Sequence, residues 1–553
     1  MLVSLGINAA MLLIFLSIYT PHFHSNDDFT LMRLADGSWG FHEHRLLYIN
    51  VVTGLLLKGL YSLLPGVSWY TVLQYFCIFS SFSALCYVLL RRWMPLPALA
   101  AALTLLYVFA LDAYIAIHYT KTAAILTVSG LFLMFHARDA EEGKVRLLTL
   151  AVGIVMALFG LMYRHQQFFA CGFLCCFIVA DQLIPLIPRL RRSLKEGLKA
   201  GFVILRPFML LLALAAGLLA VESLAFSSPE LAYYREYTNA RMAWMDYGSA
   251  PYEGHEQEYG AVGVSGAYYP ALLEHYLDPD ILSPDCFEAM SELRENAEPQ
   301  PSLSDILKSY AGYIKELLSY RVAFGLVVLG VLWLVFGRHD RAALAGMICA
   351  GLAFAGVSLL LCIRGRYNYW TSYGWLLAAA SVTLWYTPRQ AGQWSKRSAA
   401  LCTALLLLFS VWGMPSRSGM LSNEATADER LELEQIRQVA ETAKAQELLV
   451  LSSIQPFYLY RLESPFDTDS AIVTENVFYL GGWEFGHPSV MAALESRGMT
   501  NPYRDCIDKE NVLFCTKDIQ LIMNFIRDEY HPSAKAVSVS DPGSGYGLYR
   551  IAG

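Results

Sequence analysis

Two adjacent carboxylates near the amino terminus are the first candidates for chemistry in this sequence. Asp27 and Asp28 follow Ser25 and Asn26, a few residues beyond the apolar segment Leu2 to Thr20. A carboxylate placed there could act as a general base toward a hydroxyl, and a pair could help to hold a divalent cation. Ser, Asn and Asp are also the favoured residues of a helix N-cap. The acids are therefore a cap, a chemical site, or one in each role.

A second group joins one acid to several basic side chains. Asp112 ends an apolar segment, where an ionisable group is costly and usually has a partner or a role. Its other interpretation is a capping or interfacial aspartate. The basic group consists of Lys121 after His118, Arg164 before His165, and Arg364 and Arg366 before Tyr367.

These basic side chains are suited to an anion. Arginine presents a planar fork of donors that matches phosphate. Any one of them could instead reach the lipid head groups by extending its long side chain. Because four basic positions are each accompanied by His, Tyr or Trp, we predict a shared phosphate site.

Two further polar motifs have open interpretations. Asn239 and Arg241 lie in a tyrosine-rich stretch that could line a sugar pocket or fold on its own aromatic rings. His42, Glu43 and His44 could suggest a metal, but adjacent residues on a helix do not face each other. The need for a metal stays open.

The composition indicates what positions these residues. Of 553 residues, 55% are hydrophobic and 16% are charged, which is too apolar for a soluble protein of this size. The mean hydropathy is +0.38. The basic residues form no run that could follow nucleic-acid phosphates, so we expect membrane lipids and no nucleic acid as partners.

Positive charge predicts the orientation, because Lys and Arg collect in cytoplasmic loops. Five clusters fall at successive loop positions if the segment 44–64 lies along the membrane surface. We favour this because Asn50, Gly54, Lys58 and Tyr61 recur at spacings of three and four and form a polar stripe. The clustered residues are Arg91, Arg92, Arg138, Lys144, Arg146, Arg189, Arg191, Arg192, Lys195, Lys199, Arg338, Arg341, Arg389, Lys396 and Arg397.

This arrangement predicts an all-α multi-pass protein of the plasma membrane, with eleven spans, a cytoplasmic N-terminus and an extracytoplasmic C-terminus. A helix that crosses a bilayer needs about 20 mostly apolar residues. The spans are 2–20, 67–90, 95–111, 122–135, 147–163, 168–187, 200–226, 321–337, 341–363, 369–386 and 398–414.

Two domains follow from the change in composition after residue 414. Residues 1–414 form the transmembrane domain, with an interfacial outer loop at 21–66 and a large outer loop at 227–320. Residues 415–553 alternate charged helical stretches with strand-like runs, which predicts an extracytoplasmic α/β domain. In that domain Cys506 and Cys515 could close a small disulfide loop.

This layout resembles the GT-C class of integral-membrane glycosyltransferases, which take a sugar from a polyprenyl-phosphate carrier on the outer face. The resemblance rests on the acidic pair Asp27 and Asp28, the interfacial segment 44–64, the acid Asp112 in the second outer loop, and a soluble domain after the last span.

The resemblance implies that Asp27 or Asp28 is the catalytic acid/base and that Asp112 supports the site. It also implies that outer basic residues such as Lys121, Arg164 and Arg366 bind the lipid phosphate. The partners would be a polyprenyl-phosphate-sugar donor and a glycan or lipid acceptor, and no nucleotide would be needed. The competing interpretations are a transporter or lipid flippase, and a non-enzymatic envelope assembly protein.

Overall fold

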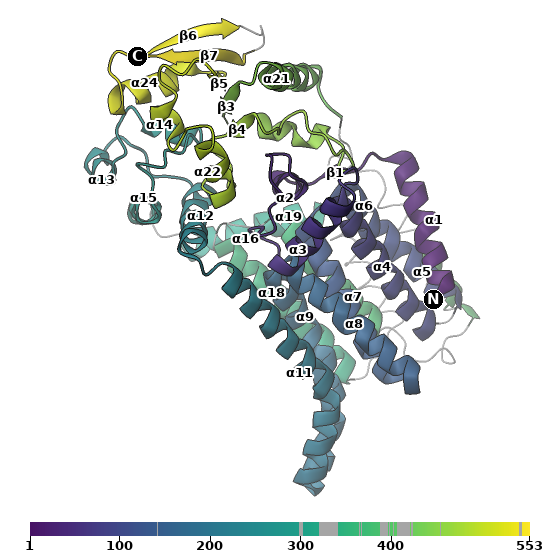
Figure 1. The fold of residues 1–553 in the computed structure, drawn as a ribbon. Helices are drawn as coiled ribbons and strands as arrows, with labels where there is room; N and C mark the ends of the chain where they lie inside the picture. The colour runs from purple at the N-terminus through teal and green to yellow at the C-terminus, as the bar shows by residue number, and fades with distance from the viewer. Residues whose placement is uncertain are drawn as a thin grey trace.

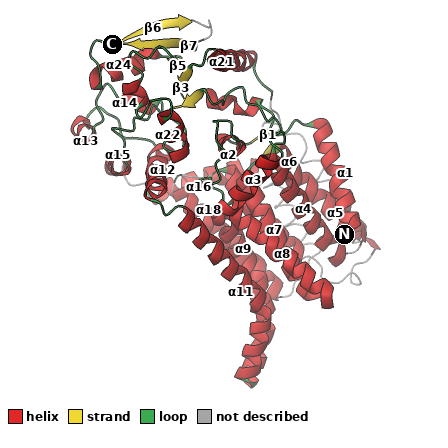
Figure 2. Cartoon of the chain, viewed as in Figure 1, coloured by secondary structure: helices red, strands yellow, loops and turns green. Residues whose placement is uncertain are grey.

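A helical bundle with an α/β unit at one end makes up the chain (Figure 1). This computed structural model describes the chain apart from residues 94, 141, 298–301, 320–340, 364, 366–367, 387–395, 398, 402, 406–420, 422–423, 454 and 541–544. The strands of the larger sheet lie together near the C-terminus, away from the bundle, whereas β1 (His22–Phe23) lies beside α2 (Asn26–Asp36) and α6 (Leu111–Ile115) (Figure 2).

Six helical stretches of the described part are long and apolar enough to cross a membrane. They coincide with six predicted spans, and the chain is a multi-pass membrane protein. The helices are α4 (Trp69–Arg92), α5 (Pro95–Leu105) with α6 (Leu111–Ile115), α7 (Tyr119–Ala140), α8 (Gly143–Tyr163), α9 (His165–Leu183) with α10 (Ile187–Arg192), and α11 (Leu194–Ala225).

The other predicted spans are covered less completely. Helices occupy three of them, namely α1 (Leu2–Ile18), α18 (Arg341–Ile363) and α19 (Tyr369–Tyr386). The span 321–337 lies outside the described residues, as does most of 398–414. The count of eleven therefore stays a prediction.

Helix α7 is the centre of the bundle, and it packs against α4, α8, α9 and α19. Its contact with α8 depends on glycine, because a Cβ on Gly130 would stand 2.4 Å from the Gly153 carbonyl oxygen. Small residues allow this close approach of two helices in a membrane. By contrast, α11 extends beyond the other helices (Figure 1) and exposes Leu198 and Phe202.

The segment predicted to lie along the membrane contains α3 (Val51–Leu63). The four residues of its predicted polar stripe do not all face water. Asn50, Gly54 and Tyr61 are buried against the protein, while Lys58 is exposed. The reason is close packing, since a Cβ on Gly54 would stand 1.8 Å from the His44 carbonyl oxygen. The orientation of α3 in a bilayer stays a prediction.

The C-terminal unit is an α/β fold, as the sequence predicts. Its sheet has the strand order β4-β3-β5-β7-β6, in which β3 is parallel to β4 and β5 while β7 is antiparallel to both neighbours. The strands are β3 (Leu449–Ser452), β4 (Val477–Tyr479), β5 (Val512–Thr516), β6 (Lys535–Ser540) and β7 (Gly547–Ala552), and the helices are α21 (Ala427–Ala445), α22 (Pro488–Glu495), α23 (Pro502–Asp505) and α24 (Ile519–Glu529). The predicted domain boundary at residue 415 lies outside the described residues.

The expected disulfide is absent from this fold, in which Cys506 and Cys515 are both free, buried thiols. Cys515 belongs to the central strand β5, whereas the Cys506 sulfur lies 3.2 Å from the Tyr503 carbonyl oxygen. Each thiol is thus packed in its own surroundings as a small hydrophobic group.

The large outer loop is ordered and packs on the C-terminal unit. The Asn501 amide donates to Asp278 Oδ1 at 3.0 Å, and Tyr268 stacks on Phe525 with ring centres 4.2 Å apart. This part of the loop therefore packs on the C-terminal unit, whereas α16 (Leu303–Ser319) packs on α18 of the bundle. The other helices of the loop are α12 (Pro229–Tyr247), α13 (Glu256–Ala261), α14 (Tyr269–Leu273) and α15 (Pro284–Ala297).

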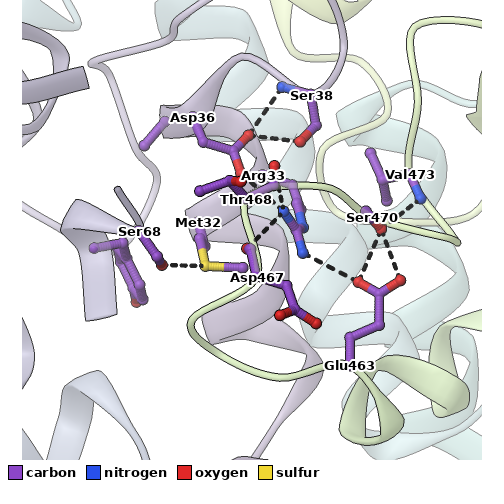
Figure 3. Close-up of polar contacts among 12 residues, drawn as sticks. Met32, Arg33, Asp36, Ser38, Ser68, Glu463, Asp467, Thr468, Ser470 and Val473 are labelled. Carbon is purple, nitrogen blue, oxygen red and sulfur yellow. Dashed lines mark hydrogen bonds and ion pairs between the residues drawn. The ribbon is translucent and has the colours of Figure 1, made fainter. Parts of the chain in front are cut away.

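The first outer loop is fixed to the C-terminal unit by a buried ionic cluster around Arg33 of α2 (Asn26–Asp36) (Figure 3). The guanidinium contacts Asp36 Oδ2 at 3.0 Å and Glu463 Oε2 at 3.1 Å. Glu463 also accepts hydrogen bonds from Ser470. Because α2 carries both candidate catalytic acids, this cluster helps to set their position.

Candidate functional site

The acidic pair separates into one buried and one partly exposed carboxylate at the start of α2. Asp28 is fully buried, and its Oδ1 accepts hydrogen bonds from Tyr70 Oη at 2.9 Å, Gln74 Nε2 at 3.0 Å and the Tyr119 backbone N–H at 2.9 Å. Burial raises the pKa of Asp28 to about 8 despite these donors. A carboxyl that is protonated and enclosed in this way holds elements together.

Asp27 is half-buried. Its carboxylate is close enough to Tyr48 and Glu484 to act on their ionisation, secondary to burial, which is the main cause of the raised pKa of both groups. Ser25 occupies the N-cap position of α2 but makes no side-chain capping bond. Of the two acids, Asp27 is therefore the one available to a substrate hydroxyl.

A short parallel pairing brings the second outer loop to α2. Strand β1 (His22–Phe23) pairs with β2 (Ala116–Ile117), which places the chain after α6 beside the acidic pair. Asp112 and Lys121, predicted to bind substrate, instead bind each other with Nζ 2.6 Å from Oδ1. Tyr369 Oη donates to the other oxygen of Asp112 at 2.9 Å. The charge of Lys121 is thus neutralised inside the protein.

His118 lies in the same loop, buried between two aromatic rings. Its imidazole stacks on Tyr119 and Trp370 with ring centres 4.8 Å and 4.9 Å away. Its Nδ1 accepts from the Thr120 N–H at 3.0 Å, so the proton of the neutral ring is on Nε2. Burial holds the pKa of His118 well below its ordinary value, and the 3.8 Å approach to Asp28 is therefore not an ion pair.

Arg164 lies at the turn between α8 and α9, against two stacked tyrosine rings. The guanidinium carbon is 4.8 Å from the centre of the Tyr48 ring and 5.6 Å from that of Tyr119, and Nη1 donates to Tyr119 Oη at 3.3 Å. The two rings are 5.8 Å apart and nearly parallel. Stacking orients the planar fork and leaves other N–H groups directed away from the rings.

A cavity of about 350 Å³ lies beside Arg164, between the outer ends of α8 and α11, the start of α3 and helix α12. It contains His165 and Asn239, two of the predicted site residues, and also Arg235, which the sequence did not single out. Its acid, Glu222, accepts a hydrogen bond from the Val51 N–H at 2.6 Å. Basic side chains beside an apolar wall suit an anionic head group with an apolar tail. The apolar wall includes Leu47, Ile49, Leu161, Met162 and Leu219.

Arg241 is buried on α12 and does not line this cavity. Its Nη1 donates to the Gly482 carbonyl oxygen, so it contacts the C-terminal unit. The neighbouring Trp483 meets Tyr48 edge to face at 5.3 Å. Sequence reasoning missed Tyr48, Trp483 and Glu484, because no local motif relates residues more than four hundred positions apart.

The remaining candidates lie elsewhere. Arg364, Arg366 and Tyr367 fall outside the described residues. The Glu43 carboxylate pairs with Arg45 at 3.0 Å and accepts a hydrogen bond from the Ser489 hydroxyl. Its oxygens therefore join the first outer loop to the C-terminal unit. Within the described ranges, no group of three or more His, Cys, Asp or Glu side chains is arranged to hold a metal ion.

The fold and the site define a multi-pass helical membrane protein with a cavity, lined by Arg164, His165 and Arg235, at the end of its bundle nearer the C-terminal unit. No family model and no curated protein matches the sequence. Two solved structures are similar along 99% of this chain and 97% of their own: ArnT from Cupriavidus metallidurans in the apo state, with TM-score 0.37 and 10% identity, and ArnT bound to undecaprenyl phosphate, with TM-score 0.38 and 13% identity. TM-scores of this size show only a loose similarity in the path of the backbone. Any reaction is therefore inferred from the side chains.

Proposed function

We propose that this chain is a membrane glycosyltransferase that moves a sugar from a polyprenyl-phosphate-linked donor to an acceptor hydroxyl on the extracytoplasmic face. The observation that carries the proposal is the cavity beside Arg164, with basic side chains on one wall and apolar side chains on another. A lipid phosphate needs both kinds of wall, since its tail stays among apolar groups while its charge is met by fixed cations.

We infer the reaction from the position of Asp27, which lies near Tyr48 and Tyr119, the tyrosine pair that contacts Arg164. Asp27 accepts the proton of the acceptor hydroxyl as its oxygen bonds to the anomeric carbon. The bond between that carbon and the phosphate oxygen breaks, and its electron pair leaves with the lipid phosphate, whose charge Arg164 stabilises. Asp28 holds α2 in place from the interior, and Asp112 with Lys121 does so for the second loop.

The test is turnover of polyprenyl-phosphate monosaccharides by the purified protein, with a cell-envelope extract as acceptor. Asp27→Asn should lower the rate by about a hundredfold or more, because general base catalysis contributes a factor of that size. Asp28→Asn should keep most of the activity, since an amide retains an acceptor oxygen for its three donors. Equal turnover by the wild type and both variants would contradict the assigned base.

Two additions to this assay separate the remaining possibilities. Arg164→Ala should weaken donor binding and raise its KM, while Arg497→Ala, in the C-terminal unit and not lining the cavity, serves as the matched control. EDTA should lower turnover if a divalent cation bridges Asp27 and the donor. Movement of the lipid across the bilayer without sugar transfer would favour a flippase instead.

A further inference from the structure

We propose that the C-terminal unit supplies the acceptor side of this site, where Trp483 and Glu484, together with Arg241 of α12, bind a hydroxyl-rich carbohydrate next to Asp27. The inference rests on the proposed function and deepens it by naming the class of acceptor. It assigns a binding role to a unit in which the sequence shows no catalytic motif.

The segment 480–487 is held tightly over the site. Tyr234 Oη donates to the Trp483 carbonyl oxygen at 3.0 Å, and Arg241 donates to that of Gly482. Position 481 has no room for a side chain, because a Cβ on Gly481 would stand 2.2 Å from the His275 carbonyl oxygen. These contacts fix the positions of Trp483 and Glu484 before any ligand binds.

Several buried polar atoms at this place have no hydrogen-bond partner among the described residues. They are Trp483 Nε1, Glu484 Oε1 and Arg241 Nε, and all three side chains are more than nine-tenths buried. A buried donor or acceptor left unpaired costs about 1–3 kcal/mol. Arg241 contacts the Gly482 carbonyl oxygen directly before Trp483 and Glu484. Asp27 is close enough to act on the ionisation of Glu484. The three atoms therefore lie in one place where a ligand would supply the missing partners.

The mixture of groups identifies the ligand chemistry. An N–H donor, a guanidinium and a carboxyl oxygen within one site match hydroxyls, which both donate and accept. A phosphate there would be repelled by Asp27, whereas the cavity beyond Tyr48 offers it Arg164, His165 and Arg235. Tyr48 touches both places, since it lines the cavity and contacts Trp483. Donor phosphate and acceptor hydroxyls thus lie on either side of one ring.

The experiment compares Glu484→Gln and Trp483→Phe with the wild type in the transferase assay. The matched control is Glu475→Gln, an exposed glutamate of the same unit. We expect the site variants to raise the KM for the acceptor about tenfold, a factor that corresponds to about 1.4 kcal/mol, and to leave the donor KM unchanged. Binding of polyprenyl phosphate, measured as a shift in Tm, should be retained and shows that the variants are folded. An acceptor KM within twofold of the wild type in both variants would overturn the inference.

A binding measurement keeps the two proposals separate. Saturation-transfer NMR with methyl glycosides of a hexose and a hexosamine is carried out on the wild type and on Glu484→Gln, whether or not turnover is seen. Absence of turnover by the wild type would contradict the proposed function alone. Weaker transfer to the glycosides in Glu484→Gln supports the carbohydrate site, whereas no binding by the wild type, or equal binding by both proteins, overturns it.

Discussion

At the scale of single residues, two neighbours of like chemistry have opposite environments. Asp27 is half-buried, whereas Asp28 is enclosed by Tyr70, Gln74 and the Tyr119 backbone. The sequence proposed both acids as a candidate pair but could not distinguish them. Two consecutive aspartates are equivalent in a local pattern, and the distinction comes from which of the pair is directed toward α4 and α7.

A pH prediction follows for Asp28, whose pKa rises from 3.8 to about 8 on folding because of burial. The unfolded chain ionises this group from about pH 4 while the folded protein keeps its proton, so Asp28 lowers the free energy of unfolding as pH rises to about 8. Asp27, His118, Tyr70 and Gln74 face it and are unchanged by the substitution. In Asp28→Asn we expect a smaller fall in Tm between pH 5 and 8 than in the wild type.

The control for this measurement is Asp469→Asn in the C-terminal unit, because the Asp469 carboxylate is not enclosed by the protein as that of Asp28 is. Its Tm should follow the wild-type pH dependence. A pH profile of Asp28→Asn that matches the wild type would show that Asp28 is ionised in the folded protein.

At the scale of elements, α2 is held by a contact that no local pattern reveals. Arg33 has no exposed surface, and its two acidic partners, Asp36 and Glu463, are more than four hundred residues apart. Carbonyl oxygens of Asp467 and Thr468 complete its surroundings at 3.4 Å (Figure 3). The C-terminal unit thereby determines where the acids of the first outer loop lie.

Removing this cation should be strongly destabilising. Arg33→Ala leaves Asp36 and Glu463 buried without a counter-charge, and breaking a buried pair in this way costs about 3–5 kcal/mol. The matched control, Arg437→Ala, breaks a half-exposed pair with Glu434 and should cost less than about 1 kcal/mol. Thermal unfolding of the detergent-purified proteins measures both. Equal Tm values for the two variants would show that the Arg33 cluster contributes nothing to the stability of the contact between α2 and the C-terminal unit.

At the scale of the whole molecule, the basic cluster between α9 and α11 and the α/β unit lie at opposite ends of the bundle (Figure 1). The chain between α9 and α11 exposes Arg191, Arg192 and Lys195 far from the sheet (Figure 1). The positive-inside bias therefore predicts that the sheet end is extracytoplasmic. This face is where the proposed reaction takes place.

Cysteine labelling in intact cells tests that orientation. In a background where Cys176 and Cys349 are replaced by serine, Ser533→Cys should react with a membrane-impermeant maleimide, because Ser533 is exposed on the C-terminal unit. Lys195→Cys should react only after the membrane is permeabilised. The reverse pattern would invert the topology and remove the proposed site from the outer face.

The sequence by itself determined the membrane class, the helical spans and the α/β unit, because apolar runs and alternation are properties of neighbouring residues. It also selected Asp27, Arg164, His165 and Asn239. Only the tertiary structure decided that Lys121 is paired with Asp112, that Asp28 is enclosed, and that Trp483 and Glu484 lie beside Tyr48. Those outcomes depend on contacts between distant segments, and the free energy that fixes them comes from burial and pairing that no local pattern records.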